Sequence, residues 1–248
     1  GDRIGVIKPQ KLSHPPHISL GFSNRLGGQS PNPYQGLNMS VSRGDSKNNV
    51  TANRGIFLKE FGIAEDQLAE PLQVSKDGIE IVDAPEEYAN CDALITSQPG
   101  VFLRVLTADC SPILIWSDST VAAVHSGWQG SELDILGQTL KKIHSEMGVE
   151  LESLYVAIGP GLSQEHFEVG PEFSDKFPLK YLSPILNTDR YLFDNNAYLR
   201  DTAILLGVPD NQIETLPFCS YRDDSLFYSH RRDGGTTGRM MSVIGINK

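Results

Sequence analysis

LTADCSPILIWSDSTVAAVHSGWQG, residues 106–130, is the stretch that decides the fold class of this chain. Its apolar runs PILIW (112–116) and VAAVH (121–125) are short, rich in Val and Ile, and bounded by the polar segments TADCS and SDST. Short apolar runs between turn residues are typical of strands with tight connections. Together with the preceding run VFLRVL (101–106), we expect them to form three strands of one sheet.

A helix is expected directly after this stretch. Apolar residues recur there at helical spacing, and they are Leu133, Leu136, Leu140, Ile143 and Met147. Ser131 and Asp134 are placed to act as a capping pair at the start of the helix, and Gly148 is placed to end it. The pattern therefore predicts one continuous amphipathic helix.

Two more helices and one more strand are predicted elsewhere in the chain. The helices run from about 48 to 61 and from about 195 to 206, and each ends at a glycine, Gly62 or Gly207. The run LYVAIG (154–159) has the composition of a strand. Because helices and short strands are mixed without a regular βαβ alternation, the expected fold class is α+β with mixed sheets.

The composition is that of an ordinary globular protein. No repeat, low-complexity tract or linker divides the 248 residues, so we expect a single domain over residues 1–248. The 31 acidic and 21 basic residues give a formal net charge of −10. The sequence has no run of basic residues that could contact successive phosphates of a nucleic acid, so nucleic acid is not an expected partner. The apolar runs are far shorter than the roughly 20 positions of a membrane span. No secretion leader is expected either, and we predict a cytoplasmic protein.

The cysteines point to reduced thiols and to one chemical site. Cys91, Cys110 and Cys219 are an odd number at wide spacing, which argues against a disulfide framework, and we expect Cys91 and Cys219 to be structural. Cys110 and His125 lie at the ends of adjacent expected strands, and Asp109 adjoins the cysteine. A neighbouring thiolate and imidazole can be a nucleophile with its base, two ligands of a soft metal ion, or a structural pair.

Several blocks of the sequence resemble the signature blocks of the YfiH-like family, also called the laccase-domain or polyphenol oxidase family. They are TADCSPIL, VAAVHSGWQG, AIGPGLSQEHFEVG and FYSHRRDGGTTGR, in the same order and spacing, and GFSNRLGGQSPNPYQGLNMS is similar to that family's opening. The resemblance implies an α/β/β/α sandwich with mixed sheets, related in outline to cysteine hydrolases. It also implies phosphorolysis of purine nucleosides (adenosine, inosine and methylthioadenosine) and deamination of adenosine.

The resemblance also implies a metal site, and this chain matches only part of it. The family uses one Cys and two His, matched here by Cys110 and His125, whereas the position of the other His holds Ser75 in LQVSKDG. Because a catalytic zinc usually has three protein ligands, we expect zinc to be weakly bound or absent. Copper is expected less, because oxygen-reducing oxidases need several coppers and this chain has six histidines. Groups that can complete the site are a ligand from a neighbouring chain, or Asp109, His14 or His17 of this chain.

Arginines and one serine are the expected substrate-binding residues. Arg25 lies beside a glycine pair in NRLGGQS, where a guanidinium and exposed N–H groups can hold a phosphate. The segment SHRRDGGTTGR concentrates Arg231, Arg232 and Arg239 around glycines in an otherwise acidic chain. We expect Arg25, Arg232, Arg239 and Ser75 to contact substrate; alternatively, the arginines pair with surface carboxylates.

These features predict an enzyme that acts on a purine nucleoside and phosphate. Arg25 and one C-terminal arginine would hold the phosphate, while His125, oriented by Asp109, would protonate the departing purine. Because position 75 holds a serine and not a histidine, the rate of deamination should be reduced more than the rate of phosphorolysis. Two alternatives remain: Cys110 attacks an amide such as a peptidoglycan precursor, or the protein only binds a ligand. A copper polyphenol oxidase is the interpretation least favoured.

Overall fold

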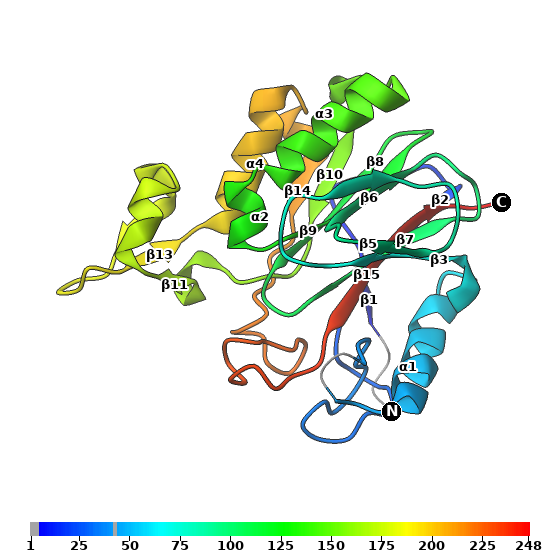
Figure 1. The fold of residues 1–248 in the computed structure, drawn as a ribbon, viewed down its shortest axis with the longest axis horizontal. Coiled ribbons are helices and arrows are strands. Elements are labelled where there is room, and N and C mark those ends of the chain that lie inside the picture. The colour runs from blue at the N-terminus through cyan, green and yellow to red at the C-terminus, as the bar shows by residue number, and fades with distance from the viewer. Residues whose placement is uncertain (1–4, 42–43) are drawn as a thin grey trace.

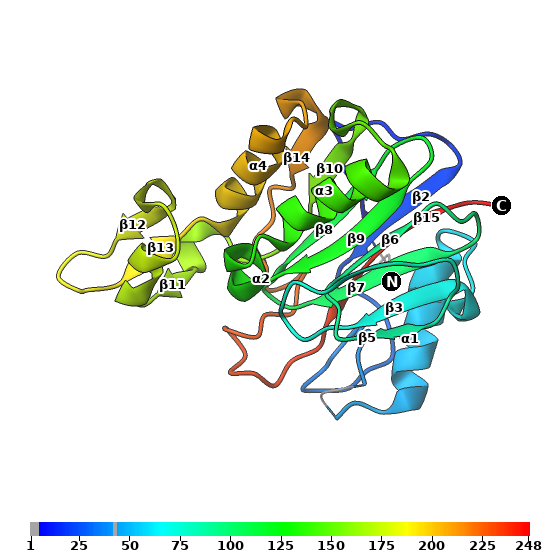
Figure 2. The ribbon, with the colours of Figure 1, turned by 45° about the horizontal axis from the view of Figure 1, so that its top comes forward.

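The computed structural model describes residues 5–41 and 44–248, which form two six-stranded sheets, a three-stranded sheet and four α-helices (Figures 1 and 2). The first sheet has the order β1 (Val6–Ile7), β2 (Ile18–Ser23), β15 (Met240–Ile246), β7 (Phe102–Thr107), β3 (Leu68–Leu72) and β5 (Glu87–Ala89). The second has the order β14 (Ile213–Thr215), β10 (Tyr155–Ile158), β8 (Ser111–Trp116), β9 (Val121–Ser126), β6 (Ala93–Thr96) and β4 (Ile79–Ile81). The third contains β11 (Glu168–Val169), β13 (Tyr191–Phe193) and β12 (Leu182–Pro184).

The helices are α1 (Lys47–Lys59), α2 (Trp128–Glu132), α3 (Ile135–Met147) and α4 (Asn195–Leu206). Single 3₁₀ turns cover Glu65–Gln67, Leu151–Ser153, Gln164–His166, Pro171–Asp175, Leu179–Tyr181 and Asp210–Gln212. Within the described ranges, no helix is both long and apolar enough to cross a bilayer.

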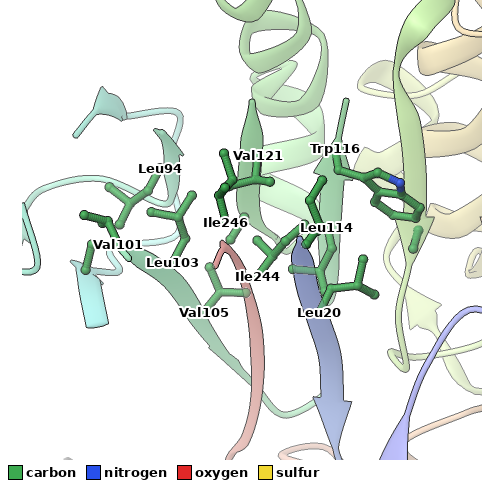
Figure 3. Packing of buried hydrophobic residues seen from close by; sticks show 14 of the residues in the cluster. Leu20, Leu94, Val101, Leu103, Val105, Leu114, Trp116, Val121, Ile244 and Ile246 are labelled. Carbon is green, nitrogen blue, oxygen red and sulfur yellow. The ribbon is translucent and has the colours of Figure 1, made fainter. Parts of the chain in front are cut away.

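The two large sheets pack face to face around a shared apolar core (Figure 3). Leu103 and Val105 of β7 in the first sheet and Leu114 and Trp116 of β8 in the second belong to this core. All four side chains are fully buried. Alternate residues of a strand face opposite sides of a sheet, so the remaining residues of these strands face outward, toward helices or the cleft described below.

Helices cover the outer faces of both large sheets (Figure 2). Leu136 and Leu140 of α3 pack on Ile113 and Ile115 of β8, and α4 joins the same cluster. On the other side of the molecule, Phe57 of α1 packs in a cluster with residues of β15 and β7. Both sheets contain parallel and antiparallel pairs. The predicted α+β class, an α/β/β/α sandwich with mixed sheets, is confirmed.

The expectation that residues 101–106 share a sheet with the next two runs is wrong. β8 pairs with β9 in the second sheet, whereas β7 pairs with β15 and β3 in the first. The turn between β7 and β8 therefore carries the chain from one sheet to the other, with Asp109 in a left-handed conformation (φ 95°). This crossover places Cys110 at the edge of the sandwich, directly before β8.

The helices differ from their predicted bounds at one important point. α4 lies where it was predicted, and α1 ends slightly earlier than expected, at Lys59. The helix predicted after residue 130 is two helices, because Asp134 takes a left-handed conformation (φ 58°) between α2 and α3. Ser131 and Asp134 are therefore not its capping pair: Ser131 lies inside α2, and Asp134 makes no side-chain capping bond. Gly148 ends α3 as predicted.

The third sheet belongs to a lobe that projects from the sandwich (Figure 2). The lobe has an aromatic core of its own, in which the rings of Phe177 and Phe193 lie with their centroids 4.4 Å apart. Phe173 and Phe167 pack on Phe193 in the same cluster. The lobe forms one wall of the cleft, because Phe167 also lines it.

Candidate active site

Cys110 and His125 open onto one cleft with a volume of about 1100 Å³. They are neighbours because β8 and β9 are antiparallel and pair Pro112 with His125. The two side chains interact through a hydrogen bond, with Cys110 half-buried and His125 only 5% exposed. The predicted juxtaposition of the thiol and the imidazole is confirmed.

Gly127 is needed for this arrangement. A Cβ atom at position 127 would lie 2.9 Å from the Cys110 sulfur, which is closer than such atoms approach. The backbone of the segment HSGWQG therefore passes directly against the thiol.

Asp92 holds His125 from the side opposite the cleft. The imidazole Nδ1 lies 2.7 Å from Asp92 Oδ1, and Asp92 is completely buried. The same carboxylate accepts three backbone N–H groups, from Val74, Ser75 and Lys76, at 3.1, 2.9 and 2.9 Å. Asp92, His125 and Cys110 therefore form a chain of polar contacts that runs from the interior to the cleft.

This chain of contacts changes the pKa values of its members. Burial by itself lowers the pKa of His125, but the electrostatic interaction with Cys110 and the hydrogen bond to Asp92 outweigh burial and raise it to about 10. Burial raises the pKa of Asp92, but hydrogen bonds from His125 and the backbone outweigh it, so the pKa of Asp92 is lowered. Asp92 is therefore a carboxylate that favours a charged imidazole.

Asp109 does not orient His125, and this corrects the expectation from the sequence. Its Oδ1 accepts the hydroxyl of Ser220 at 2.7 Å, and its Oδ2 accepts the backbone N–H of Arg231 at 2.7 Å. Asp109 faces these loops because its left-handed conformation turns the side chain away from β9. Asp92 takes the orienting place.

Ser75 lies in the same cleft as Cys110 and His125, where the sequence predicts a site residue. Its backbone takes a left-handed conformation (φ 58°), which lets consecutive N–H groups wrap the Asp92 carboxylate. Its side chain faces the cleft at the position where the family resemblance implies a histidine.

The residues present do not fit the metal that the resemblance implies. Among residues 5–41 and 44–248, no three His, Cys, Asp or Glu side chains are grouped to hold a metal ion. His17 contacts the carbonyl of Asp118, in the hairpin turn at the opposite end of β8 from Cys110. His14 contacts the carbonyl of Pro15, and Asp109 contacts Ser220 and Arg231. The three residues of this chain proposed to complete the site therefore do not do so.

The predicted arginines separate into two groups. Arg239 lines the cleft together with Arg231. Arg25 lies outside the lining, with its guanidinium 4.6 Å from the centroid of the Tyr228 ring and hydrogen-bonded to the carbonyls of Gln35 and Asp224. Arg239 therefore lines the same cleft as Cys110 and His125, and Arg25 does not.

Arg232 is occupied by the loop that carries it. Its five N–H groups meet the carboxylate of Asp233 and the carbonyls of Ser220, Tyr221 and Phe227. It does not line the cleft in the part of the chain that the structure describes. Arg232 thus braces the loop and leaves no donor for a phosphate.

The cleft has two ends, which we name by their residues. The near end contains Cys110 and His125. The far end contains Arg54 of α1, Arg104 of β7 and Glu70 of β3. Glu70 accepts from Arg104 Nε at 2.9 Å and from Arg54 Nη1 at 3.3 Å, so the charges at the far end compensate one another.

Sequence reasoning missed Asp92 and His230 at the near end. Asp92 directly precedes β6, and the register Ala93 to Val124 places it opposite His125. That register was the one signal for Asp92, and it depends on the pairing of β6 with β9, which the sequence does not reveal. His230 stands beside the noted arginines, and only the loop conformation brings it into the cleft.

Comparison with known proteins assigns the family. Residues 19–247 match the family described as multi-copper polyphenol oxidoreductase laccase. The chain belongs to this family. Within the laccase-like family, a purine nucleoside phosphorylase of Deinococcus radiodurans is 34% identical over 95% of this chain and 92% of its own. Purine nucleoside phosphorylase YfiH of Escherichia coli is 31% identical, over 96% and 98%.

Solved structures of the laccase-like family share the fold. The hypothetical protein YfiH of Bacillus licheniformis matches with a TM-score of 0.89 at 28% identity, over 92% of both chains. YlmD of Geobacillus stearothermophilus matches with a TM-score of 0.87 at 28% identity, over 94% of this chain and 93% of its own. The resemblance found in the sequence is confirmed. The family description implies a metal, copper or zinc, for which the near end supplies only two of the expected ligands.

Proposed function

We propose that this protein is a purine nucleoside phosphorylase that cleaves adenosine, inosine and methylthioadenosine with inorganic phosphate. The observation that carries the proposal is the Asp92–His125–Cys110 chain of contacts, which opens into a cleft that Arg239 also lines. The names of the relatives from D. radiodurans and E. coli support it. We place the reaction in the cytoplasm, where three unpaired cysteines are stable.

In this reaction a phosphate oxygen bonds to C1′ of the ribose while the bond from C1′ to the purine nitrogen breaks. The electron pair of that bond leaves with the purine, which takes up a proton. We assign Arg239 and Arg231 to the phosphate, because both line the cleft and guanidinium groups there can offset its charge. Cys110, hydrogen-bonded to His125, lines the same cleft, and we assign its side chain to the wall against which the nucleoside binds.

Deamination of adenosine is proposed to be slow relative to phosphorolysis. Attack by water at C6 would need an activated water, and the near end offers Ser75 where a third ligand for an activating metal would stand. Phosphorolysis needs no such water, because phosphate is itself the nucleophile. We therefore propose that this chain carries out phosphorolysis without depending on a metal.

The test incubates chelator-treated protein with adenosine or inosine, with and without phosphate, and separates the products by chromatography. We expect free base and ribose 1-phosphate to form only when phosphate is present. Base release that does not depend on phosphate would indicate a hydrolase. If no base is released, the proposal is wrong and the protein is better interpreted as one that only binds a ligand. Formation of inosine from adenosine as fast as phosphorolysis would overturn the proposed order of activities.

A second candidate function is favoured by the order of the contacts Asp92, His125 and Cys110. The same order of carboxylate, imidazole and thiol serves cysteine hydrolases. Here the Cys110 sulfur would bond to an amide carbonyl, such as that of a peptidoglycan precursor, and the amine would leave with a proton from His125. Water would then hydrolyse the thioester. Mass spectrometry of the protein mixed with cell-wall peptides tests this candidate, which predicts a thioester on Cys110 and release of the amine.

A further inference from the structure

His230 is an imidazole in the cleft whose ring nitrogens have no partner among the described residues. It lines the cleft with Cys110 and Arg231, and it is exposed. In contrast, every other histidine of the chain makes a ring contact with a protein group: His14, His17, His125, His144 and His166. His230 is thus the histidine left available to a ligand.

The backbone at His230 is held firmly although its ring is exposed. The N–H of Arg231, the next peptide unit, donates to Asp109 Oδ2 at 2.7 Å. The N–H of Gly235 donates to the carbonyl of His230 at 2.9 Å, which closes the loop. Because Asp109 directly precedes Cys110 in the chain, these bonds tie the base of the His230 side chain to the near end of the cleft.

Gly235 also confines the imidazole. It has a φ of 90°, and a Cβ atom there would lie 3.3 Å from His230 Cε1. The ring therefore packs along a bare stretch of backbone, which limits its motion on one side. Such an imidazole is both exposed and positioned.

His125 is poorly suited to give a proton to a ligand. Its Nδ1 is held by Asp92 at 2.7 Å, and Cys110 occupies its other side. A general acid needs a nitrogen within hydrogen-bonding reach of the atom that it protonates. In His125 both nitrogens already face protein groups, so a departing purine finds no free N–H there.

We propose that His230 is the general acid of the phosphorolysis, an inference that rests on the proposed function. As the bond from C1′ to the purine N9 breaks, the electron pair moves into the purine ring, and a ring N–H of His230 transfers its proton to N7. His230 gives up one proton in this step, and it regains one through the solvent, which receives the proton that the phosphate loses when its oxygen bonds to C1′. This assigns His230 the role that the sequence suggested for His125.

The experiment compares two substrates in the variant His230→Gln. Inosine needs a proton at N7 when its base leaves, whereas 7-methylguanosine already carries a methyl group and a positive charge there. We expect kcat for inosine to fall by about 100-fold or more, the usual contribution of a general acid, while kcat for 7-methylguanosine stays close to that of the unmodified protein.

His166→Gln is the matched control. The ring of His166 stacks on Tyr221, with centroids 4.7 Å apart, and it does not line the cleft within the described ranges. This variant should retain both activities, and urea unfolding should give similar midpoints for both variants and the unmodified protein.

Three results would contradict the assignment or its basis. An equal loss on both nucleosides would mean that His230 positions the loop or the substrate and does not donate the proton. Unchanged activity on both would exclude it from the reaction. Failure of the unmodified protein on both nucleosides would instead overturn the proposed function, so the two kinds of failure are distinguishable.

Discussion

The two ends of the cleft differ in how their polar groups are satisfied. At the far end, Arg104 is 6% exposed and is paired with Glu70, which also accepts from Arg54. At the near end, Cys110 is half-buried beside the ligand space, and His230 has an exposed ring without a partner among the described residues. Both ends are polar, but the buried charges at the far end are paired with one another, whereas Cys110 and His230 at the near end face the ligand space.

The difference separates a stabilising network from a reactive one. Buried charges that are paired with each other contribute to a unique fold, and breaking the pair leaves an uncompensated charge. A group that must act on a substrate needs hydrogen-bonding capacity that the protein has not used. Substitutions at the two ends should therefore affect different measurements, activity at the near end and stability at the far end.

The largest effect is expected at Cys110. Replacing Cys110 by Ala removes the sulfur that faces the cleft, and we expect kcat/KM for nucleoside phosphorolysis to fall by about 1000-fold or more. The stability of the variant should change little, because the side chain is only half-buried. Steady-state kinetics and urea unfolding measure the two quantities. The control is Cys219→Ala, at a buried cysteine outside the cleft lining. An equal loss of activity in this variant would show that the effect at Cys110 does not depend on its position in the cleft.

The next effect is expected at the far end, on stability. Glu70→Ala leaves Arg104 buried without its partner, so the free energy of unfolding should fall by about 3–5 kcal/mol. The folded fraction should still turn over nucleoside, because the near end is intact. In the control Glu65→Ala, the lost carboxylate is 37% exposed, and the change should stay below about 1 kcal/mol. If both variants lose the same free energy of unfolding, the burial of the Arg104–Glu70 pair does not determine how much the pair contributes to stability.

A smaller effect is expected at Asp92. The variant Asp92→Asn keeps the shape of the side chain but removes the negative charge that holds His125, so kcat/KM should fall about 10- to 100-fold. The control is Asp77→Asn. Asp77 directly follows Lys76, which donates to Asp92, but its own carboxylate accepts from Gln138, so this change should leave the kinetics unchanged. If Asp92→Asn retained full activity in the folded state, the polar chain from Asp92 to Cys110 would have no part in the reaction.

The smallest perturbation is chemical labelling, which distinguishes the cysteines without changing the sequence. Iodoacetamide should modify Cys110 in the folded protein, while Cys91 and Cys219, which are buried, should react only after unfolding. Burial raises the pKa of Cys91 to about 11, so this thiol stays protonated at about pH 8 and becomes reactive only as the pH approaches that value. Mass spectrometry of peptides measures the labelling, and rapid modification of Cys91 at neutral pH would contradict the assignment.

Local patterns in the sequence were sufficient for several elements. α4 was predicted at its observed bounds, because Asp194 caps its first turn and Gly207 takes the left-handed conformation that ends it. The pairing of Cys110 with His125 was also predictable, because the hairpin of β8 and β9 has a connection of only a few residues. In these cases the residues that determine the structure lie close together in the chain.

The prediction failed where a backbone conformation or a distant contact decided the result. The helix expected after residue 130 breaks at Asp134, whose left-handed conformation no apolar periodicity reveals. Neighbouring residues predict a substrate contact for Arg25 and for Arg239 alike, but in the structure Arg25 lies on the ring of Tyr228 while Arg239 lines the cleft. Which of several similar arginines reaches a site depends on loop geometry.

The sequence by itself determined the fold class, the family and the thiol–imidazole pair, because periodicity, turn chemistry and short hairpins act over a few residues. Tertiary structure alone decided that β7 joins the opposite sheet. It alone brought Asp92 to His125 across 33 residues, and Asp109 to the loop of His230 across 122. Such contacts form only when the whole core packs, since closing a long loop costs entropy that one local contact does not repay.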